Sequence, residues 1–356
     1  MNKNSMIKLS VPAAPSVNSI IPYLEMINKN RQYSNFGPLH DLLVNRLATY
    51  FNVPENCIVL TCNATQAIAA AVSTSFQDNN IWHTPSWTFT ATPAGIIQGG
   101  GQPHFIDRKV DWNADIKDGY KNVLDVLPFG DSINHDIFSR DYNNLIIDAA
   151  ASFDSLRSMN LPIKIPTGVI VSLHATKLMS AGEGGVFITN DESWAKRVRS
   201  WSNFGFEIGS RISHLTGTNA KLSEYNCAVA LASLDIWPKT RDSYVSMSNK
   251  AIEISKRCGF TVSPAMRKGL ATPYWVAKFN DAKTKILVKE NLFNMGIDTR
   301  DWWGEGCDAM KAYSKYLVNS LDNTKDFYST TIGLPFHPEL TEADLRQIET
   351  SILAAS

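Results

Sequence analysis

Lys177 is the residue of this sequence whose type and setting best suit nucleophilic chemistry. It follows a β-branched apolar run at residues 168–173 and precedes a glycine-rich turn at residues 182–185. A lysine at the end of a strand, among small residues, can lose its hydration, and its amine then forms Schiff bases with carbonyl compounds. Taken alone, Lys177 could equally be a solvated surface charge, as most lysines are.

Two further residues could serve the same site. Asp148 ends an apolar run that begins at Leu145, and Trp87 lies in the motif SWTF at residues 86–89. A lysine, a strand-end aspartate and a stacking aromatic ring are what a pyridoxal phosphate site requires. The alternatives are a strand-end cap for Asp148 and a buried core side chain for Trp87.

The composition excludes several classes of partner. The chain of 356 residues carries 34 basic and 34 acidic side chains, so its formal net charge is zero, and it has no block of like charge. This balance argues against nucleic acid and membrane partners. The five cysteines follow no metal-ligand spacing and their number is odd, which predicts reduced thiols in the cytoplasm. We expect no secretory signal and no transmembrane helix, because no apolar run is long enough.

Strand-like and helix-like segments alternate from residue 57 to about residue 235. This alternation predicts an α/β domain with a mostly parallel, seven-stranded sheet flanked by helices. Helices are expected at 65–76, 92–98 and 191–202, and the expected strands are residues 57–60, 81–83, 104–106, 123–127, 145–148, 168–173 and 185–189. Asp148 and Ser172 then fall at the carboxyl ends of strands, where ligands of such sheets gather.

The C-terminal third predicts a smaller α+β domain. Helices are expected at 223–234, from Pro238 to about residue 258, at 282–295 and after Thr341, where Thr341 and Asp344 form a capping box. Strands are expected at 259–262 and 274–279. We therefore divide the chain into a large domain, residues 1–236, and a small domain, residues 237–356.

Seven short motifs, taken in order, resemble the DegT/DnrJ/EryC1/StrS family of nucleotide-sugar aminotransferases. This family is a branch of the fold type I enzymes that use pyridoxal 5'-phosphate. The motifs are YSNFGP (33–38), NAT (63–65), PSWTFTAT (85–92), IDAA (147–150), SLHATK (172–177) with GEGG (182–185), GTNAKLSE (217–224) and LPFHP (334–338). The resemblance runs nearly from end to end of the chain.

The resemblance implies a role for each residue of the cofactor site. Lys177 would form the Schiff base and then move a proton between the cofactor and the sugar carbon. Asp148 would pair with the protonated pyridine nitrogen, and Trp87 would stack on the ring. The backbone amides of Ala64 and Thr65 would face the phosphate at the start of a helix.

Further contacts follow from the same resemblance. The Thr65 and Ser172 hydroxyls would add donors to the phosphate, and Asn219 would reach it from the neighbouring subunit of a homodimer with shared active sites. Ordinary turn or capping polarity is the alternative for Ser172 and Asn219. Phe36 belongs to the opening motif, near the expected substrate.

Some residues near the expected substrate are ambiguous. For His174 we favour an orienting or structural role over that of a base. Trp302 and Trp303 lie in an irregular stretch that we expect to line the substrate entrance, although a tryptophan pair also suits packing. Ala151 stands where many family members carry histidine or glutamine, so one polar contact to the cofactor ring is either absent or supplied elsewhere, by Gln66 or Ser152.

The predicted function is transamination of a nucleotide-linked keto sugar. L-glutamate would leave as 2-oxoglutarate after converting the cofactor to pyridoxamine phosphate. The amine would then pass to C-4 of dTDP-4-keto-6-deoxyglucose, giving dTDP-4-amino-4,6-dideoxyglucose for O-antigen and lipopolysaccharide biosynthesis. One alternative is a C-3 aminotransferase acting on a dTDP-3-keto-6-deoxyhexose. Another is a non-catalytic regulatory protein on the same fold.

Overall fold

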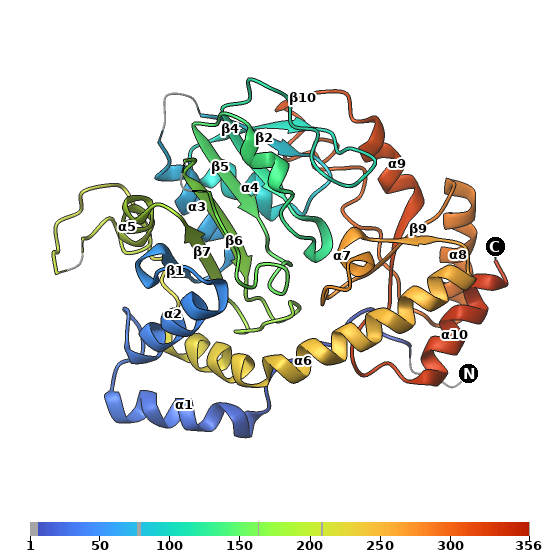
Figure 1. Cartoon of the computed structure of the whole chain (residues 1–356), viewed down its shortest axis with the longest axis horizontal. Coiled ribbons are helices and arrows are strands. Elements are labelled where there is room, and N and C mark those ends of the chain that lie inside the picture. The colour runs from blue at the N-terminus through green and yellow to red at the C-terminus, as the bar shows by residue number, and fades with distance from the viewer. Residues whose placement is uncertain (1–5, 77–79, 163, 208, 356) are drawn as a thin grey trace.

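A mixed sheet forms the centre of the larger part of the molecule in the computed structural model, which describes residues 6–76, 80–162, 164–207 and 209–355 (Figure 1). In these ranges eight strands follow the order β1-β7-β6-β5-β4-β2-β3-β10. The strands are β1 (Ile58–Thr61), β2 (Ile81–Pro85), β3 (Gln102–Ile106), β4 (Asn122–Val126), β5 (Asn144–Asp148), β6 (Thr167–Ser172), β7 (Gly185–Thr189) and β10 (Leu317–Val318). All seven predicted strands are present, and the mostly parallel α/β architecture is confirmed, with β7 antiparallel to both of its neighbours.

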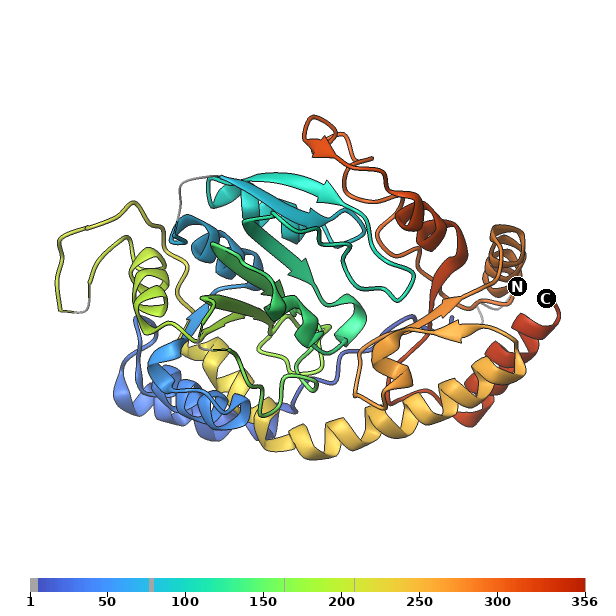
Figure 2. The same cartoon turned by 45° about the horizontal axis from the view of Figure 1, so that its top comes forward.

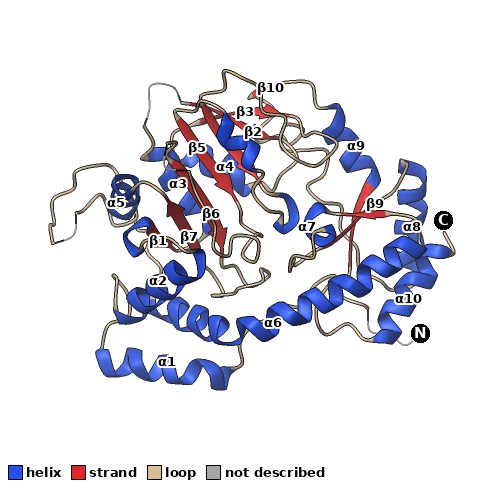
Figure 3. Cartoon of the chain, in the orientation of Figure 1, coloured by secondary structure: helices blue, strands red, loops and turns tan. Residues whose placement is uncertain are grey.

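Helices cover both faces of this sheet, which explains why its central strands are apolar throughout (Figure 3). Ile146 and Ile170 point into one core, shared with α3 (Ala64–Ser73) and α5 (Glu192–Trp201). Ile147 and Val171 point into the other core, which includes α2 (Pro38–Phe51). The helices α1 (Val17–Asn30) and α4 (Ala91–Gln98) complete this part of the chain.

One long helix, α6 (Glu224–Arg257), connects the two parts of the molecule. Figure 2 shows it running beneath both of them. The predicted break into two helices before Pro238 is wrong, because Pro238 lies inside a continuous helix. A proline there removes one backbone donor, but packing holds both halves in place: α1 and α2 contact one half, and β8 and β9 the other. The boundary that we placed between residues 236 and 237 falls within this helix.

The C-terminal part is built on a small antiparallel sheet. In the described chain it has the order β11-β9-β8, with strands β8 (Thr261–Val262), β9 (Trp275–Lys278) and β11 (Thr331–Leu334). Its helices are α7 (Pro264–Arg267), α8 (Ala282–Asn294), α9 (Asp322–Thr330) and α10 (Glu342–Leu353). The predicted capping box is present, because Thr341 and Asp344 bond each other's backbone amides at the start of α10. No described helix is long and apolar enough to cross a membrane.

The two parts of the chain exchange short segments. β10 follows the small sheet's helix α8 in sequence, yet it pairs in parallel with β3 and forms the edge of the large sheet. In the opposite direction, the N-terminal segment packs onto the C-terminal part: Ile7 forms a β-bridge with Ile297, and the Leu9 carbonyl accepts a hydrogen bond of 2.9 Å from the Phe336 amide. The large sheet therefore has one strand more than the seven that we predicted.

Candidate active site

The carboxyl ends of two neighbouring strands bring predicted site residues together. β5 ends at Asp148 and β6 ends at Ser172, and the two strands are paired in parallel through Asp148 and Ile170. Both side chains are buried, each with 6% of its surface exposed. This edge of the sheet is where we expected a ligand site, because ligands of open α/β sheets bind beyond the carboxyl ends of strands.

Asp148 is a buried carboxylate that is held in a fixed orientation. Its Oδ2 accepts a hydrogen bond of 2.7 Å from the Thr92 hydroxyl, and its Oδ1 accepts one of 3.1 Å from the Ala150 amide. Burial raises the pKa of Asp148, while these two donors and the positive charges of Lys177 and Arg108 oppose the rise. Because both bonded donors are neutral, a cation placed against this carboxylate would be strongly favoured.

Lys177 lies in the loop that follows β6. Hydrogen bonds from the Leu173 and Ala175 amides to the Gly184 and Gly182 carbonyls fold this loop back on itself, as the glycine-rich turn requires. The Lys177 side chain is half-buried, and its Nζ donates a 2.7 Å hydrogen bond to Tyr274 Oη. Sequence reasoning missed Tyr274, because 97 residues separate the pair and no local pattern connects them.

The start of α3 lies beside the same edge of the sheet. Asn63 caps the helix by accepting the Gln66 amide, and the amides of Ala64 and Thr65 lie in the first turn, where a helix offers no partner. Gly185 pairs with Thr61 on one side and with Ser172 on the other. A Cβ atom on Gly185 would lie 2.5 Å from the Asn63 carbonyl, so only glycine lets the sheet approach this helix so closely.

Trp87 does not occupy the position that we predicted. It is completely buried in an aromatic cluster, where Phe327 stacks on it with ring centroids 4.9 Å apart, and its indole N–H donates to the Trp302 carbonyl. A ring enclosed in this way has no face left for a cofactor, so the core alternative describes Trp87 and the stacking assignment is wrong. Phe89, two residues further along the same loop, is 62% exposed.

These residues fit pyridoxal phosphate on structural grounds. A buried carboxylate with neutral partners suits a protonated ring nitrogen, and Lys177 supplies an amine in the loop that follows the neighbouring strand β6. The first turn of α3 offers amide donors to a phosphate. In the described ranges no group of three or more histidine, cysteine or acidic residues could hold a metal ion.

Comparison with known proteins agrees with this geometry. The model of the DegT/DnrJ/EryC1/StrS aminotransferase family matches residues 16–123 and 135–353. The chain belongs to this family. It is an enzyme, a pyridoxal phosphate-dependent sugar aminotransferase, as the resemblance in the sequence implied.

Individual relatives extend the likeness over the whole chain. The dTDP-4-amino-4,6-dideoxy-D-glucose transaminase of Shigella dysenteriae is 28% identical, and the alignment covers 96% of each protein. The structure of DesI in the presence of its TDP-sugar product is 25% identical, with a TM-score of 0.81 over 99% of this chain and 93% of that one. NtdA from Bacillus subtilis with bound PMP shares the fold, with a TM-score of 0.81, 17% identity and coverage of 95% of this chain and 81% of that one.

In this aminotransferase, Trp302 contacts Tyr274, the partner of Lys177, and Trp303 contacts Phe129, which in turn contacts Tyr274. The Trp302 ring meets the Tyr274 ring edge-on at 5.0 Å, and Trp303 stacks on Phe129 at 4.5 Å. Both tryptophans are partly exposed and pack against the Trp87 cluster. They therefore combine the packing role with a place near the site, and their contact with substrate stays a prediction.

His174 contacts polar groups of its own loop and of the glycine-rich turn, and its role stays a prediction. Its Nδ1 shares a hydrogen bond of 2.9 Å with the Thr176 hydroxyl, and its Nε2 lies 3.6 Å from Glu183. The side chain is 45% exposed.

Of the two residues suggested to replace the missing polar contact, Gln66 donates to Gln98, whereas the hydroxyl of Ser152 is buried without a partner among the described residues.

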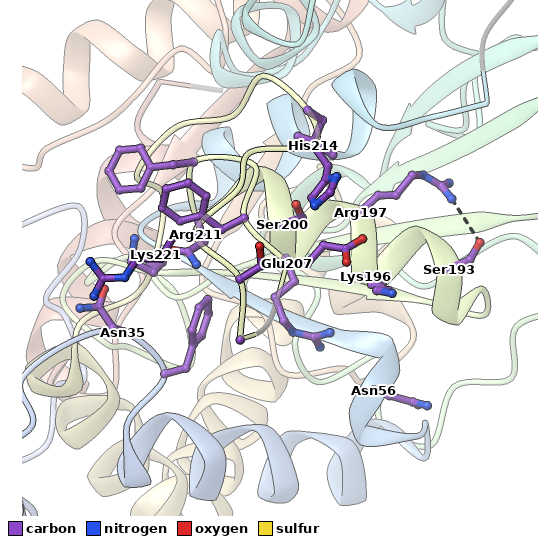
Figure 4. A pocket seen from close by; sticks show the side chains of 18 of the residues that line it. Asn35, Asn56, Ser193, Lys196, Arg197, Ser200, Glu207, Arg211, His214 and Lys221 are labelled. Carbon is purple, nitrogen blue, oxygen red and sulfur yellow. Dashed lines mark hydrogen bonds between the residues drawn. The ribbon is translucent and has the colours of Figure 1, made fainter.

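Phe36 and Asn219 are associated with the arm formed by residues 203–207 and 209–221. Phe36 lines a cavity of about 1160 Å³ between α5 and this arm, and Lys177 and Asp148 do not line it (Figure 4). Asn219 forms a bridge with Asn203 at the base of this arm and is exposed. The substrate contact predicted for Phe36 and the contact predicted for Asn219 with a second subunit both stay predictions.

Proposed function

We propose that this enzyme moves an amino group from L-glutamate to C-4 of a dTDP-linked keto-6-deoxyhexose. The product would be dTDP-4-amino-4,6-dideoxyglucose, used in O-antigen biosynthesis in the cytoplasm. The observation that carries the proposal is the site itself, with a half-buried lysine beside a buried carboxylate at the ends of β5 and β6. The choice of sugar is supported by the Shigella transaminase, which is aligned over nearly its whole length, and by DesI, which was solved with a TDP-sugar product.

Each residue contributes binding, orientation or proton transfer. Bound pyridoxal phosphate supplies an electron sink, which allows an amine to be exchanged for a ketone. Asp148 would hold the ring nitrogen in its protonated form, with Thr92 and Ala150 fixing the carboxylate. Lys177 would link to the cofactor, and its freed amine would carry the proton between carbon atoms. The first turn of α3 and the Ser172 hydroxyl would bind the phosphate.

The exposed Phe89 would take the stacking role that Trp87 cannot fill. A ring placed on the cofactor face contributes about 1 kcal/mol beyond the area that it buries. We further propose a homodimer in which Asn219 of each arm completes the partner's phosphate site. This arrangement would explain why the side chain of Asn219 is exposed.

The test is a substrate panel with a defined product analysis. The purified enzyme, loaded with pyridoxal phosphate, is incubated with glutamate and separate 3-keto and 4-keto dTDP-6-deoxyhexoses, and NMR locates the new amine. Amination at C-4 is expected, and amination at C-3 would replace the proposal by its alternative. Lys177→Ala should lose all turnover while its melting temperature is preserved. Normal turnover by that variant would refute the role of Lys177.

A further inference from the structure

Tyr274 approaches Lys177 from the C-terminal part of the chain. It lies immediately before β9, and its Oη accepts a hydrogen bond of 2.7 Å from Lys177 Nζ. The same Nζ lies 5.3 Å from the centroid of the Tyr274 ring. The phenol therefore meets the amine on which the proposed reaction depends, and it comes from the segment that precedes β9 of the small sheet.

The position of Tyr274 is determined by several independent contacts. Its ring is held edge-on between Phe129, at 5.7 Å, and Trp302, at 5.0 Å. Its backbone amide donates to the Thr272 hydroxyl at 3.3 Å, and that hydroxyl donates to the Phe129 carbonyl at 2.6 Å. Phe129 follows β4 of the large sheet, so these contacts connect Tyr274 to the same sheet that carries Asp148.

The Phe129 turn is itself specialised. Phe129 has a φ of 56°, in the left-handed region, which is a costly conformation for a bulky residue. Trp303, which stacks on Phe129, also has a positive φ of 55°. Residues in such conformations persist where surrounding contacts determine them, and they are concentrated at functional sites. Of this strained pair, Phe129 contacts the Tyr274 ring directly, and Trp303 stacks on Phe129.

We propose that Tyr274 is a positioning residue for Lys177 and assists its proton transfers. A phenol both donates and accepts hydrogen bonds. When Lys177 is an ammonium, Nζ donates to Tyr274 Oη, and when Lys177 is a neutral amine, the phenol O–H donates to Nζ. The amine thus keeps its position while it takes a proton from one carbon and returns it to another, and no proton leaves Tyr274. The proposal rests on the proposed role of Lys177.

The expected effect is a change in pH dependence. Loss of the phenol oxygen removes the hydrogen bond from both forms of Lys177, but the bond to the ammonium is the stronger one because it is charge-assisted. Tyr274→Phe should therefore shift the acidic limb of the pH–rate profile to lower pH. A charge-assisted hydrogen bond of this kind corresponds to a shift of about one pH unit, or about tenfold in the protonation equilibrium. The rate at the optimum should fall about tenfold or more, because the amine is no longer held.

The experiment uses the cofactor-loaded enzyme in a single half-reaction. Stopped-flow absorbance of the bound cofactor follows its conversion by excess glutamate across a range of pH. Tyr313→Phe is the matched control, because Tyr313 is also half-buried and its hydroxyl makes one hydrogen bond, to the Thr90 carbonyl. Tyr274→Leu is measured in parallel, so the conclusion does not depend on the folding of one variant. Melting temperatures are recorded for all variants.

Borohydride reduction followed by peptide mass spectrometry separates the two ways of failing. If the cofactor is not attached to Lys177 in the unmodified enzyme, the proposed function fails. If attachment is normal but the profiles of both Tyr274 variants coincide with those of the unmodified enzyme and of Tyr313→Phe, only the role of Tyr274 is refuted. A shift confined to the Tyr274 variants, with attachment at Lys177 retained, supports the proposal.

Discussion

Gly185→Ala tests whether the close approach of β7 to α3 forms the phosphate site. An added Cβ would lie 2.5 Å from Asn63 C and O and 2.6 Å from Ala64 N, whereas ordinary contact begins at 3.4 Å. The helix start or the strand must therefore move by about 0.9 Å. All three neighbours are backbone atoms, so no side-chain rotation can relieve the overlap.

Two effects of different size should follow. Overpacking of a buried site costs about 1–3 kcal/mol of unfolding free energy. Displacement of the first turn of α3 also misaligns amide donors to a phosphate, and a hydrogen bond to a charged group contributes about 1.5–3 kcal/mol. Cofactor affinity should therefore fall by about 10- to 100-fold, since 1.4 kcal/mol corresponds to a factor of ten.

Gly168→Ala is the matched control on the neighbouring strand. Its Cβ would lie 2.7 Å from the Phe187 ring and 3.3 Å from the Trp194 ring, away from the start of α3. Cofactor titration by absorbance and urea unfolding are measured for both variants. Both should lose stability, but only Gly185→Ala should lose affinity. Equal cofactor affinity in Gly185→Ala and the unmodified enzyme would refute the placement of the phosphate.

Three further predictions concern the aromatic loop that carries Phe89, the strand β2 and the helix α9. Phe89→Ala should weaken cofactor binding about fivefold. Trp87→Phe should leave cofactor binding unchanged and lower only the melting temperature. Cofactor titration and thermal unfolding of both variants test this prediction. Burial and His104 lower the pKa of His83 to about 4, so the unfolded chain takes up a proton at higher pH than the folded one. The unfolding free energy should fall by at most about 3 kcal/mol as pH drops from 6.5 to 4, and His83→Phe should abolish this loss in urea titrations at several pH values. Asp107→Ala should cost about 2–4 kcal/mol in urea unfolding, because its carboxylate accepts three hydrogen bonds from the start of α9; a loss below 1 kcal/mol would contradict this account.

The sequence predicted those features of the fold that depend on local periodicity. The central strands are unbroken apolar runs with polar residues at their ends, so Asp148 and Ser172 could be placed at the edge of the sheet. The capping box at Thr341 is also a local signal. By contrast, the continuity of α6 through Pro238 results from packing on both halves of the helix, and a proline by itself indicates a break.

The candidate site was predictable only in part, for a similar reason. Trp87 and Phe89 lie two residues apart on an irregular loop, where no periodicity determines which ring is buried. The aromatic partners that enclose Trp87, such as Phe327, come from distant parts of the chain. Tyr274 was missed because its contact with Lys177 depends on how the small sheet packs against the large one. Motif order identified the family, but it does not determine such contacts.

The two parts of this chain are mutually dependent. β10 covers the edge of β3, so a fragment ending within α6 would expose a parallel strand edge, and such edges promote aggregation. The C-terminal part, expressed alone, would lose the bridge from Ile7 to Ile297. We therefore expect the enzyme to fold and unfold as a single cooperative unit, and its folding to be slow, because pairings between residues hundreds of positions apart must form together.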